Sequence, residues 1–193
     1  MIFYMIINEK KYASKPLYQH EAAHMLLDIS LKKAAGIENY SLRRGSHGKP
    51  YLENYPEVFF NLSHCDGLAV CGVSDREIGV DCELIRHYRG NAARKIFSDR
   101  EIDLVFNSDD PDEKFFRIWT LKEALGKAFG TGILSGLKKY EFSFENGAPV
   151  CKILPDKFFT QKIIYGQWIV SSCSDRPETE FEEISVFDTK HGG

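Results

Sequence analysis

Apolar residues recur with two different periods along the chain, and the change of period separates predicted strands from predicted helices. From residue 78 to residue 84 every second position is apolar, which is the pattern of a half-buried strand. From residue 112 to residue 129 the apolar positions Ile118, Leu121 and Leu125 recur at helical spacing instead. The pattern therefore predicts a strand at 78–84 and a helix at 112–129.

The same periods assign the rest of the chain. Strands are predicted at residues 1–7, 58–64, 68–73, 140–144, 150–154, 163–165, 168–173 and 184–187, and helices at 18–35, 91–96 and 98–106. Asp66-Gly67 and Asn146-Gly147 are hairpin-turn signals between neighbouring strands. A chain of 193 residues has room for one large domain, or for two small ones that share a core.

A short internal echo predicts how these elements are organised. The residues Val70, Ser74, Asp75 and Arg76 recur with the same spacing as Val170, Ser174, Asp175 and Arg176, and each set ends an apolar strand. Such self-similarity indicates a duplicated unit. We therefore predict an α+β fold of two similar halves, residues 1–77 and residues 78–193.

Two carboxylates of the predicted strand are the first candidate for chemistry. Asp81 and Glu83 lie two positions apart, so both side chains point to one face of the strand. Neighbouring carboxylates repel each other unless water or a cation screens them, and a hard divalent ion is the usual functional remedy. On these two residues alone, an outward-facing acidic strand is the favoured alternative.

Charged residues of the predicted helix favour a cation site over a plain acidic strand. Trp119, Glu123 and Lys127 form a stripe beside its apolar face, although Glu123 and Lys127 at this spacing also suit a plain surface ion pair. Lys122 lies close to the centre of the apolar face, where a charge breaks the binary pattern. Such conflicts are expected at functional sites. We predict that three carboxylates and two lysines converge on a metal ion and a phosphate ester.

Composition narrows the class of protein. Hydrophobic residues make up 43% of the chain and charged residues 27%, as in ordinary globular proteins, and the net charge of −3 argues against bulk binding of nucleic acid. Five cysteines without a C-x-x-C pair favour reduced thiols in a cytosolic protein. The short apolar start has no basic region, and no apolar run approaches the roughly 18 residues of a membrane span. We expect a soluble, cytoplasmic protein without membrane or nucleic-acid partners.

Other segments carry candidate ligands that also have structural explanations. His20 and His24 match the H-E-x-x-H zinc-peptidase pattern, but no third ligand is evident downstream, so this match is weak. Lys49, in a glycine-containing loop, could contact phosphate, with little specificity as a pattern. Glu101 completes a capping box that begins at Ser98, a structural role worth on the order of 1 kcal/mol.

Five short motifs, taken in order, resemble a known family. They are Gly48-Lys49-Pro50, Phe60-Asn61-Leu62-Ser63-His64, Ile78-Gly79-Val80-Asp81-Cys82-Glu83, Phe97-Ser98-Asp99-Arg100-Glu101 and Trp119-Thr120-Leu121-Lys122-Glu123-Ala124-Leu125-Gly126-Lys127. Together they resemble the 4′-phosphopantetheinyl transferase superfamily, and specifically the pseudo-dimeric type that activates surfactin synthetase. The resemblance extends from about residue 20 to about residue 175 and implies a pseudo-two-fold arrangement of the two halves.

The resemblance implies a reaction and a set of roles. The enzyme would transfer phosphopantetheine from coenzyme A to a serine of an apo carrier protein and release adenosine 3′,5′-bisphosphate. The implied roles are Mg²⁺ ligands for Asp81, Glu83 and Glu123, catalytic contact with the coenzyme A phosphates for Lys127, nucleotide contacts for Lys49, Ser63 and His64, and a candidate catalytic role for Glu101. Either Glu123 or Glu101 would accept the serine proton.

One position departs from the family pattern. The first helix of the family usually carries an arginine near a coenzyme A phosphate, and the aligned residue here is His24. Lys33 and the Arg43-Arg44 pair are the candidates to replace that arginine.

The identity of the carrier protein stays open, as does selectivity for acylated coenzyme A. We expect a monomer whose basic residues Arg86, Arg89, Arg94 and Lys95 dock an acidic carrier. The alternatives are a non-catalytic module that binds coenzyme A or carrier protein, and a zinc peptidase that uses His20 and His24.

Overall fold

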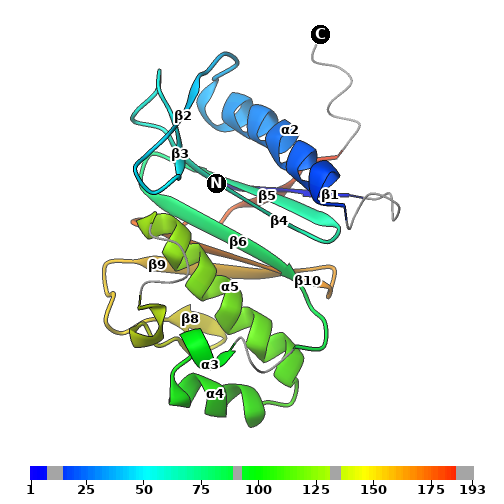
Figure 1. Ribbon diagram of the computed structural model, residues 1–193, viewed down its shortest axis with the longest axis vertical. Helices are drawn as coiled ribbons and strands as arrows, with labels where there is room; N and C mark the ends of the chain where they lie inside the picture. The colour runs from blue at the N-terminus through cyan, green and yellow to red at the C-terminus, as the bar shows by residue number, and fades with distance from the viewer. Residues whose placement is uncertain (8–14, 89–92, 131–135, 186–193) are drawn as a thin grey trace.

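The computed structural model describes residues 1–7, 15–88, 93–130 and 136–185 of the chain (Figure 1). Its helices are α2 (Pro16–Ala35), α3 (Ala93–Ile96), α4 (Asp99–Phe106), α5 (Pro111–Phe129) and the single 3₁₀ turn η1 (Leu137–Lys139). Its strands are β1 (Ile2–Ile6), β2 (Leu42–Arg44), β3 (Pro50–Leu52), β4 (Phe59–Cys65), β5 (Leu68–Ser74), β6 (Ile78–Leu84), β7 (Ser143–Glu145), β8 (Ala148–Val150), β9 (Phe158–Ile164), β10 (Trp168–Ser174) and β11 (Phe181–Glu183).

The two halves of the chain build the same arrangement. One sheet has the strand order β11-β1-β5-β4 and the other has the order β6-β10-β9. In the first half β1 pairs antiparallel with β5, and β5 pairs antiparallel with β4. In the second half β6 pairs antiparallel with β10, and β10 pairs antiparallel with β9. Helix α2 packs on the first sheet and α5 on the second (Figure 1). The predicted α+β fold of two similar halves is confirmed, and the echo lies on the corresponding strands β5 and β10.

Alternation within the strands sorts side chains into layers. Odd-numbered residues such as Phe3, Cys71 and Val73 pack with the leucines of α2. Even-numbered residues such as Val70 and Val80 fill the space between the two sheets instead. Because β5 is covered on both faces, all seven of its residues are buried. The odd-numbered positions of β6 are left to face α5, and these include both carboxylates of the acidic strand.

Polar side chains of β4 join the two sheets at their edges. β6 is an edge strand of its sheet, so every second amide N–H points away from β10 and needs another partner. The Val80 amide donates to Asn61 Oδ1 at 2.8 Å, and the Cys82 amide donates to Ser63 Oγ at 3.4 Å. These two contacts hold β4 beside the face of β6 that carries the acidic residues.

One strand crosses the predicted boundary between the halves. β11 belongs to the second half in sequence but pairs parallel with β1 in the first sheet, and the Ile184 amide donates to the Tyr4 carbonyl at 2.8 Å. The C-terminal segment therefore returns to the first sheet. The division into residues 1–77 and 78–193 stays a prediction.

Sequence periodicity misplaced the strands that are short or exposed. No strand was predicted at β2 or β3, because the residues of this hairpin show little apolar alternation. β9 begins at Phe158, five residues before the predicted start at 163, because its exposed and half-buried side chains break the expected pattern. Part of the predicted helix at 91–96 and of the predicted strand at 184–187 lies outside the described residues.

Two expectations from composition have structural counterparts. All five cysteines are free and buried, which agrees with reduced thiols. Within the part of the chain that the structure describes, no helix has the length and apolar character needed to cross a membrane.

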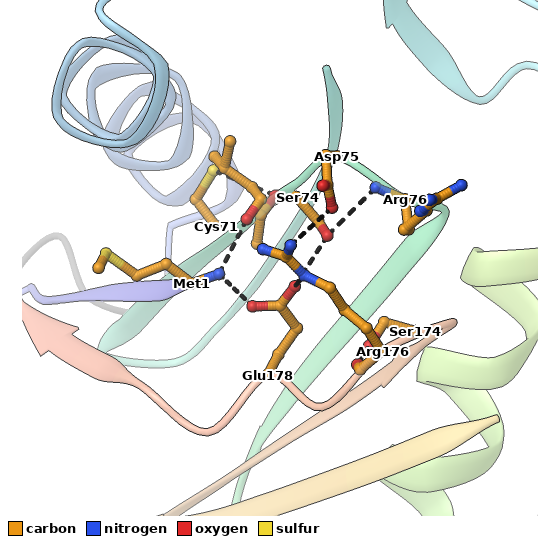
Figure 2. A network of polar contacts seen from close by, with 10 residues as sticks. Met1, Cys71, Ser74, Asp75, Arg76, Ser174, Arg176 and Glu178 are labelled. Carbon is orange, nitrogen blue, oxygen red and sulfur yellow. Dashed lines mark hydrogen bonds and ion pairs between the residues drawn. The ribbon is translucent and has the colours of Figure 1, made fainter. Parts of the chain in front are cut away.

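A buried carboxylate ties the C-terminal segment to both copies of the echo (Figure 2). Glu178 is 4% exposed and accepts hydrogen bonds from Ser74 Oγ at 2.8 Å and Arg176 Nε at 3.1 Å, and it pairs with the Met1 ammonium group. Arg176 also pairs with Asp75 at 2.9 Å. Desolvation opposes ionisation of Glu178, but its hydrogen bonds outweigh this and lower its pKa.

Replacing Glu178 by Gln should lower the free energy of unfolding by about 1–3 kcal/mol at pH 7, because one side chain accepts several charge-assisted hydrogen bonds. A carboxyl whose folded pKa is depressed stabilises the fold above its unfolded pKa and loses that contribution as pH falls through the folded value. Urea unfolding should therefore show a difference from the unaltered protein that shrinks at acid pH. Glu180→Gln, at an exposed neighbouring position, is the matched control and should change little.

Candidate functional site

A close approach of α5 to β6 creates the site. A Cβ atom placed on Gly79 would lie 2.1 Å from the Ala124 carbonyl oxygen and 2.3 Å from the Ala128 amide nitrogen, so only glycine allows the helix to lie this close. Gly79, Asp81 and Glu83 share one face of β6 because side chains alternate along a strand. The helix therefore crosses the strand directly beside its two carboxylates.

Helix α5 adds two of the predicted residues to this face. Lys127 Nζ donates to Asp81 Oδ1 at 2.7 Å and to Ser63 Oγ at 2.8 Å, while Ser63 Oγ donates to Asp81 Oδ1 at 2.8 Å. Desolvation acts to lower the pKa of Lys127, but the adjacent Asp81 carboxylate outweighs it and raises that pKa. Glu123, one turn earlier on α5, is 8% exposed and lies among the same groups. Asp81, Glu83, Glu123, Lys127 and Ser63 are thus brought together as predicted.

Burial and the charge of Asp81 destabilise the ionised forms of both glutamates. Burial, with the charge of Asp81 as the next cause, raises the pKa of Glu83 to about 7 and the pKa of Glu123 to about 7. Lys127 pairs with Asp81, and Arg86 pairs with Glu83 at 3.6 Å, so three ionised carboxylates would keep one negative charge in excess. The site therefore carries excess negative charge that a cation would relieve.

The unpartnered oxygens test whether this site suits a divalent cation. Asp81 Oδ2 and Glu123 Oε1 are buried and have no hydrogen-bond partner among the described residues. Buried oxygens in this state are costly unless a ligand satisfies them. No three His, Cys, Asp or Glu side chains in the described part of the chain stand close enough to enclose an ion by themselves. This fits Mg²⁺, which takes one or two carboxylates and completes its octahedron with waters and substrate phosphates.

Three adjoining pockets surround these groups. The central pocket has a volume of about 350 Å³ and is lined by Leu62, Ser63, His64, Asp81, Cys82, Glu83, Trp119, Glu123 and Lys127. It shares Leu62 and His64 with a pocket of about 270 Å³ toward α2 and β2. It shares Glu83 and Trp119 with a pocket of about 460 Å³ that is lined mainly by aromatic residues. An elongated ligand would meet a different chemical environment in each pocket.

Glu101 has no part in this cluster. Its carboxylate is fully buried, caps the amide of Ser98 at 2.7 Å, accepts from the Phe142 amide at 2.8 Å and pairs with Lys122 at 2.9 Å. Both carboxylate oxygens are occupied by fixed internal partners, so the arrangement gives no support to the predicted catalytic role. The capping box predicted from the sequence is present.

Lys122 was expected at the site and lies elsewhere. Its ammonium group is fully buried and donates to the carbonyl oxygens of Leu137 and Tyr140, both at 3.0 Å, besides pairing with Glu101. The charge that breaks the apolar pattern of α5 therefore joins α4, α5 and η1 inside the second half. A local conflict in the pattern correctly indicated a special residue, but its function is structural.

Lys49 also serves a different purpose from the one predicted. Lys49 Nζ pairs with Glu77 at 2.6 Å and donates to the carbonyl oxygens of Ile78 at 3.3 Å and Ala128 at 3.2 Å. It lines none of the three pockets described above. Lys49 therefore anchors its loop to the start of β6 and the end of α5, and a direct contact with a nucleotide has no support in this position.

Two of the candidates to replace the missing arginine lie in the same pocket as His24. Arg43 and Arg44 line the same pocket as His20, His24 and His64. Lys33, the other candidate, pairs with Glu182 at 2.6 Å.

Among the described residues, no third metal-ligand side chain joins His20 and His24, so a zinc centre has no support there. Gly79 and Asn61 also shape the site, and their positions in two of the motifs could have indicated this.

Sequence comparisons with known proteins agree on one family. A sequence model described as the 4′-phosphopantetheinyl transferase superfamily matches residues 77–173. A 4′-phosphopantetheinyl transferase of Bacillus subtilis is 30% identical over 158 residues, which cover 77% of this chain and 70% of the relative. The 4′-phosphopantetheinyl transferase HetI of Nostoc is 42% identical over 96 residues, which cover 46% of this chain and 40% of the relative. The holo-[acyl-carrier-protein] synthase of Neisseria meningitidis aligns with a TM-score of 0.44 at 16% identity, over 52% of this chain and 98% of that structure.

Removing one carboxylate should stabilise the metal-free protein. A carboxyl whose folded pKa is raised contributes stability that is present below its unfolded pKa and lost as pH rises through the folded value, here about 7 for Glu123. Glu123→Gln should therefore raise the free energy of unfolding at pH 8 by on the order of 1–2 kcal/mol in the presence of a chelator, and should change it little at pH 4. Thermal unfolding at both pH values measures this. A variant that is less stable at pH 8 would contradict the proposed repulsion.

Proposed function

Because the chain belongs to the 4′-phosphopantetheinyl transferase superfamily and is an enzyme of that class, we propose that it transfers phosphopantetheine from coenzyme A to a serine of an apo carrier protein. The observation that carries the proposal is the convergence of Asp81, Glu123 and Lys127 from β6 and α5 on one pocket. This set of groups suits a diphosphate, because it pairs an ammonium group with carboxylates that can hold a cation.

The three adjoining pockets support an orientation for coenzyme A. The nucleotide end, with its phosphate monoester, is assigned to the pocket of His24, Arg43 and Arg44, where cationic side chains gather. The diphosphate is assigned to the central pocket, beside Lys127. Ser63 and His64 lie where the two pockets meet. The aromatic pocket at the far end is left for the approaching carrier protein.

The residues of the central pocket supply the chemistry of transfer. The serine oxygen of the carrier forms a new bond to the phosphorus that bears pantetheine, and the bond from that phosphorus to the oxygen bridging the two phosphates breaks. Adenosine 3′,5′-bisphosphate leaves with the electron pair, and Lys127 stabilises the negative charge that develops on it. Glu123, whose Oε1 atom has no other partner among the described residues, accepts the serine proton. One or two of the carboxylates of Asp81, Glu83 and Glu123 would hold a magnesium ion, which would neutralise charge on the diphosphate.

The carrier protein is proposed to dock beside the aromatic pocket. Arg86 lines that pocket, and Arg94 and Lys95 are exposed on the nearby α3, whereas Arg89 lies outside the described residues. Acidic carriers would be attracted by this basic surface. We propose that the enzyme acts as a monomer in the cytoplasm, where its five free cysteines would stay reduced. Its net charge of −3 gives no reason to expect a nucleic-acid partner.

Mass spectrometry of carrier proteins tests the activity directly. Incubated with coenzyme A and magnesium, the enzyme should add the mass of one phosphopantetheine group to at least one apo carrier from a panel drawn from fatty-acid, polyketide and peptide synthesis. Asp81→Asn should abolish transfer, because Asp81 holds Lys127 and offers an oxygen to the cation.

Circular dichroism must show that Asp81→Asn keeps the fold. The alternative is a non-catalytic module, which would bind coenzyme A with an affinity that magnesium does not change and would modify no carrier. That combination of results would overturn the proposed activity.

The docking surface is tested by charge reversal. The double substitution Arg94→Glu and Lys95→Glu should raise KM for the carrier by about tenfold at low ionic strength and leave KM for coenzyme A unchanged, since both side chains are exposed and line none of the three pockets. Reversal of the exposed Lys32, which lies on α2 in the first half and lines none of the three pockets, is the control. An unchanged KM for the carrier at low salt would contradict docking at this surface.

A further inference from the structure

The pocket between α2, β2 and β4 gathers an unusual number of imidazole groups. Its described lining contains three histidines and two arginines, and no carboxylate is among the described lining residues; the full set is His20, Ala23, His24, Leu42, Arg43, Arg44, Pro50, Phe60, Leu62 and His64. Histidine is the side chain that changes charge near neutral pH, whereas arginine stays charged throughout. The charge of this pocket therefore depends on pH in a way that a pocket of lysines and arginines would not show.

Two of the imidazoles are in contact. His20 and His24 lie one turn apart on α2, and their ring centroids are separated by 4.4 Å with the planes tilted by 45°. Burial first, and then the neighbouring charge of His20, lowers the pKa of His24. Two imidazolium groups at this distance repel each other, so the empty pocket resists double protonation.

Charged groups on every neighbouring element act on these imidazoles. On α2 itself, Asp28 favours the protonated form of His24, whereas Arg44 on β2 opposes it. On β4, burial and the charge of Lys127 lower the pKa of His64, and Asp81 on β6 acts in the opposite direction. Both arginines are partly engaged: Arg43 Nε pairs with Glu53 at 3.1 Å, and Arg44 donates to the Gly48 carbonyl at 3.1 Å. In the free protein His24 and His64 are thus held toward their neutral forms.

A bound phosphate would reverse this balance. A phosphate monoester carries close to two negative charges at neutral pH and offers three strong acceptor oxygens. Each neutral imidazole beside it would gain a charge-assisted hydrogen bond by taking up a proton. Proton uptake and phosphate binding would therefore favour each other, as linkage requires.

We propose that the His20–His24 pair is a proton-linked subsite for the phosphate monoester at the nucleotide end of coenzyme A. The affinity for coenzyme A then falls as pH rises through the neutral range. This inference rests on the proposed function, since it takes coenzyme A as the ligand. Histidines would bind the phosphate monoester here, whereas an arginine in their place would keep a constant charge.

A comparison of coenzyme A with dephospho-coenzyme A, which lacks only this monoester, tests the proposal. Isothermal titration between pH 6.5 and 8.5, at constant magnesium and ionic strength, should show coenzyme A losing affinity by up to roughly tenfold per pH unit for each coupled proton. Dephospho-coenzyme A should bind with nearly constant affinity. Titrations in two buffers of different ionisation enthalpy should reveal net proton uptake for coenzyme A alone.

Three variants separate proton linkage from a general effect of pH. His24→Arg should flatten the pH dependence and raise the affinity for coenzyme A at pH 8.5, because the charge no longer requires a proton. His20→Gln should lower the proton uptake. His47→Gln, at an exposed histidine outside this pocket, should behave as the unaltered protein.

Equal pH dependence for the two ligands, or an unchanged slope in His24→Arg, would overturn the proton-linked subsite while leaving the transferase proposal intact. Failure of both ligands to bind at every pH would instead overturn the proposed function and this subsite with it.

Discussion

Electrostatic repulsion among Asp81, Glu83 and Glu123 is the constraint on which the rest of the structure depends. These carboxylates are kept in one partly buried pocket although desolvation and their mutual charge raise the pKa values of both glutamates to about 7. The fold enforces this arrangement through the close contact of α5 with β6, which only a glycine at position 79 permits. Stability given up at such a site is a common feature of functional centres.

The surrounding structure compensates with interactions that hold the elements of the site in place. Asn61 and Ser63 satisfy amides on the free edge of β6 and so hold the first sheet against the site. In the second half, the fully buried Lys122–Glu101 pair joins α4 and α5. A buried ion pair adds little net stability, because desolvation offsets the attraction, but loss of one partner would leave a buried charge unpaired. These contacts fix the orientation of α5 and therefore of Glu123 and Lys127.

The duplicated fold explains why the pockets differ along their length. The central pocket forms where β4 of the first half meets β6 and α5 of the second half, so residues of both halves line it. The first half supplies the cationic pocket between α2 and β2, and the second half supplies the aromatic pocket beside α5. A single ligand that spans both halves would meet charge at one end and aromatic faces at the other.

The local sequence pattern determined several strands and helices and the face on which two of the carboxylates lie. The strand at 78–84, the helix that carries Glu123 and Lys127, and the shared face of Asp81 and Glu83 all follow from the spacing of residues along one element, and the echo of β5 in β10 indicated the duplication. Tertiary structure alone decided which charged residues face the pocket. Glu101 and Lys49 belong to the same series of motifs as the residues of the site, yet their partners, Lys122 and Glu77, lie 21 and 28 residues away. Periodicity within one element does not encode contacts between elements, because those contacts depend on how the helices and strands pack on one another.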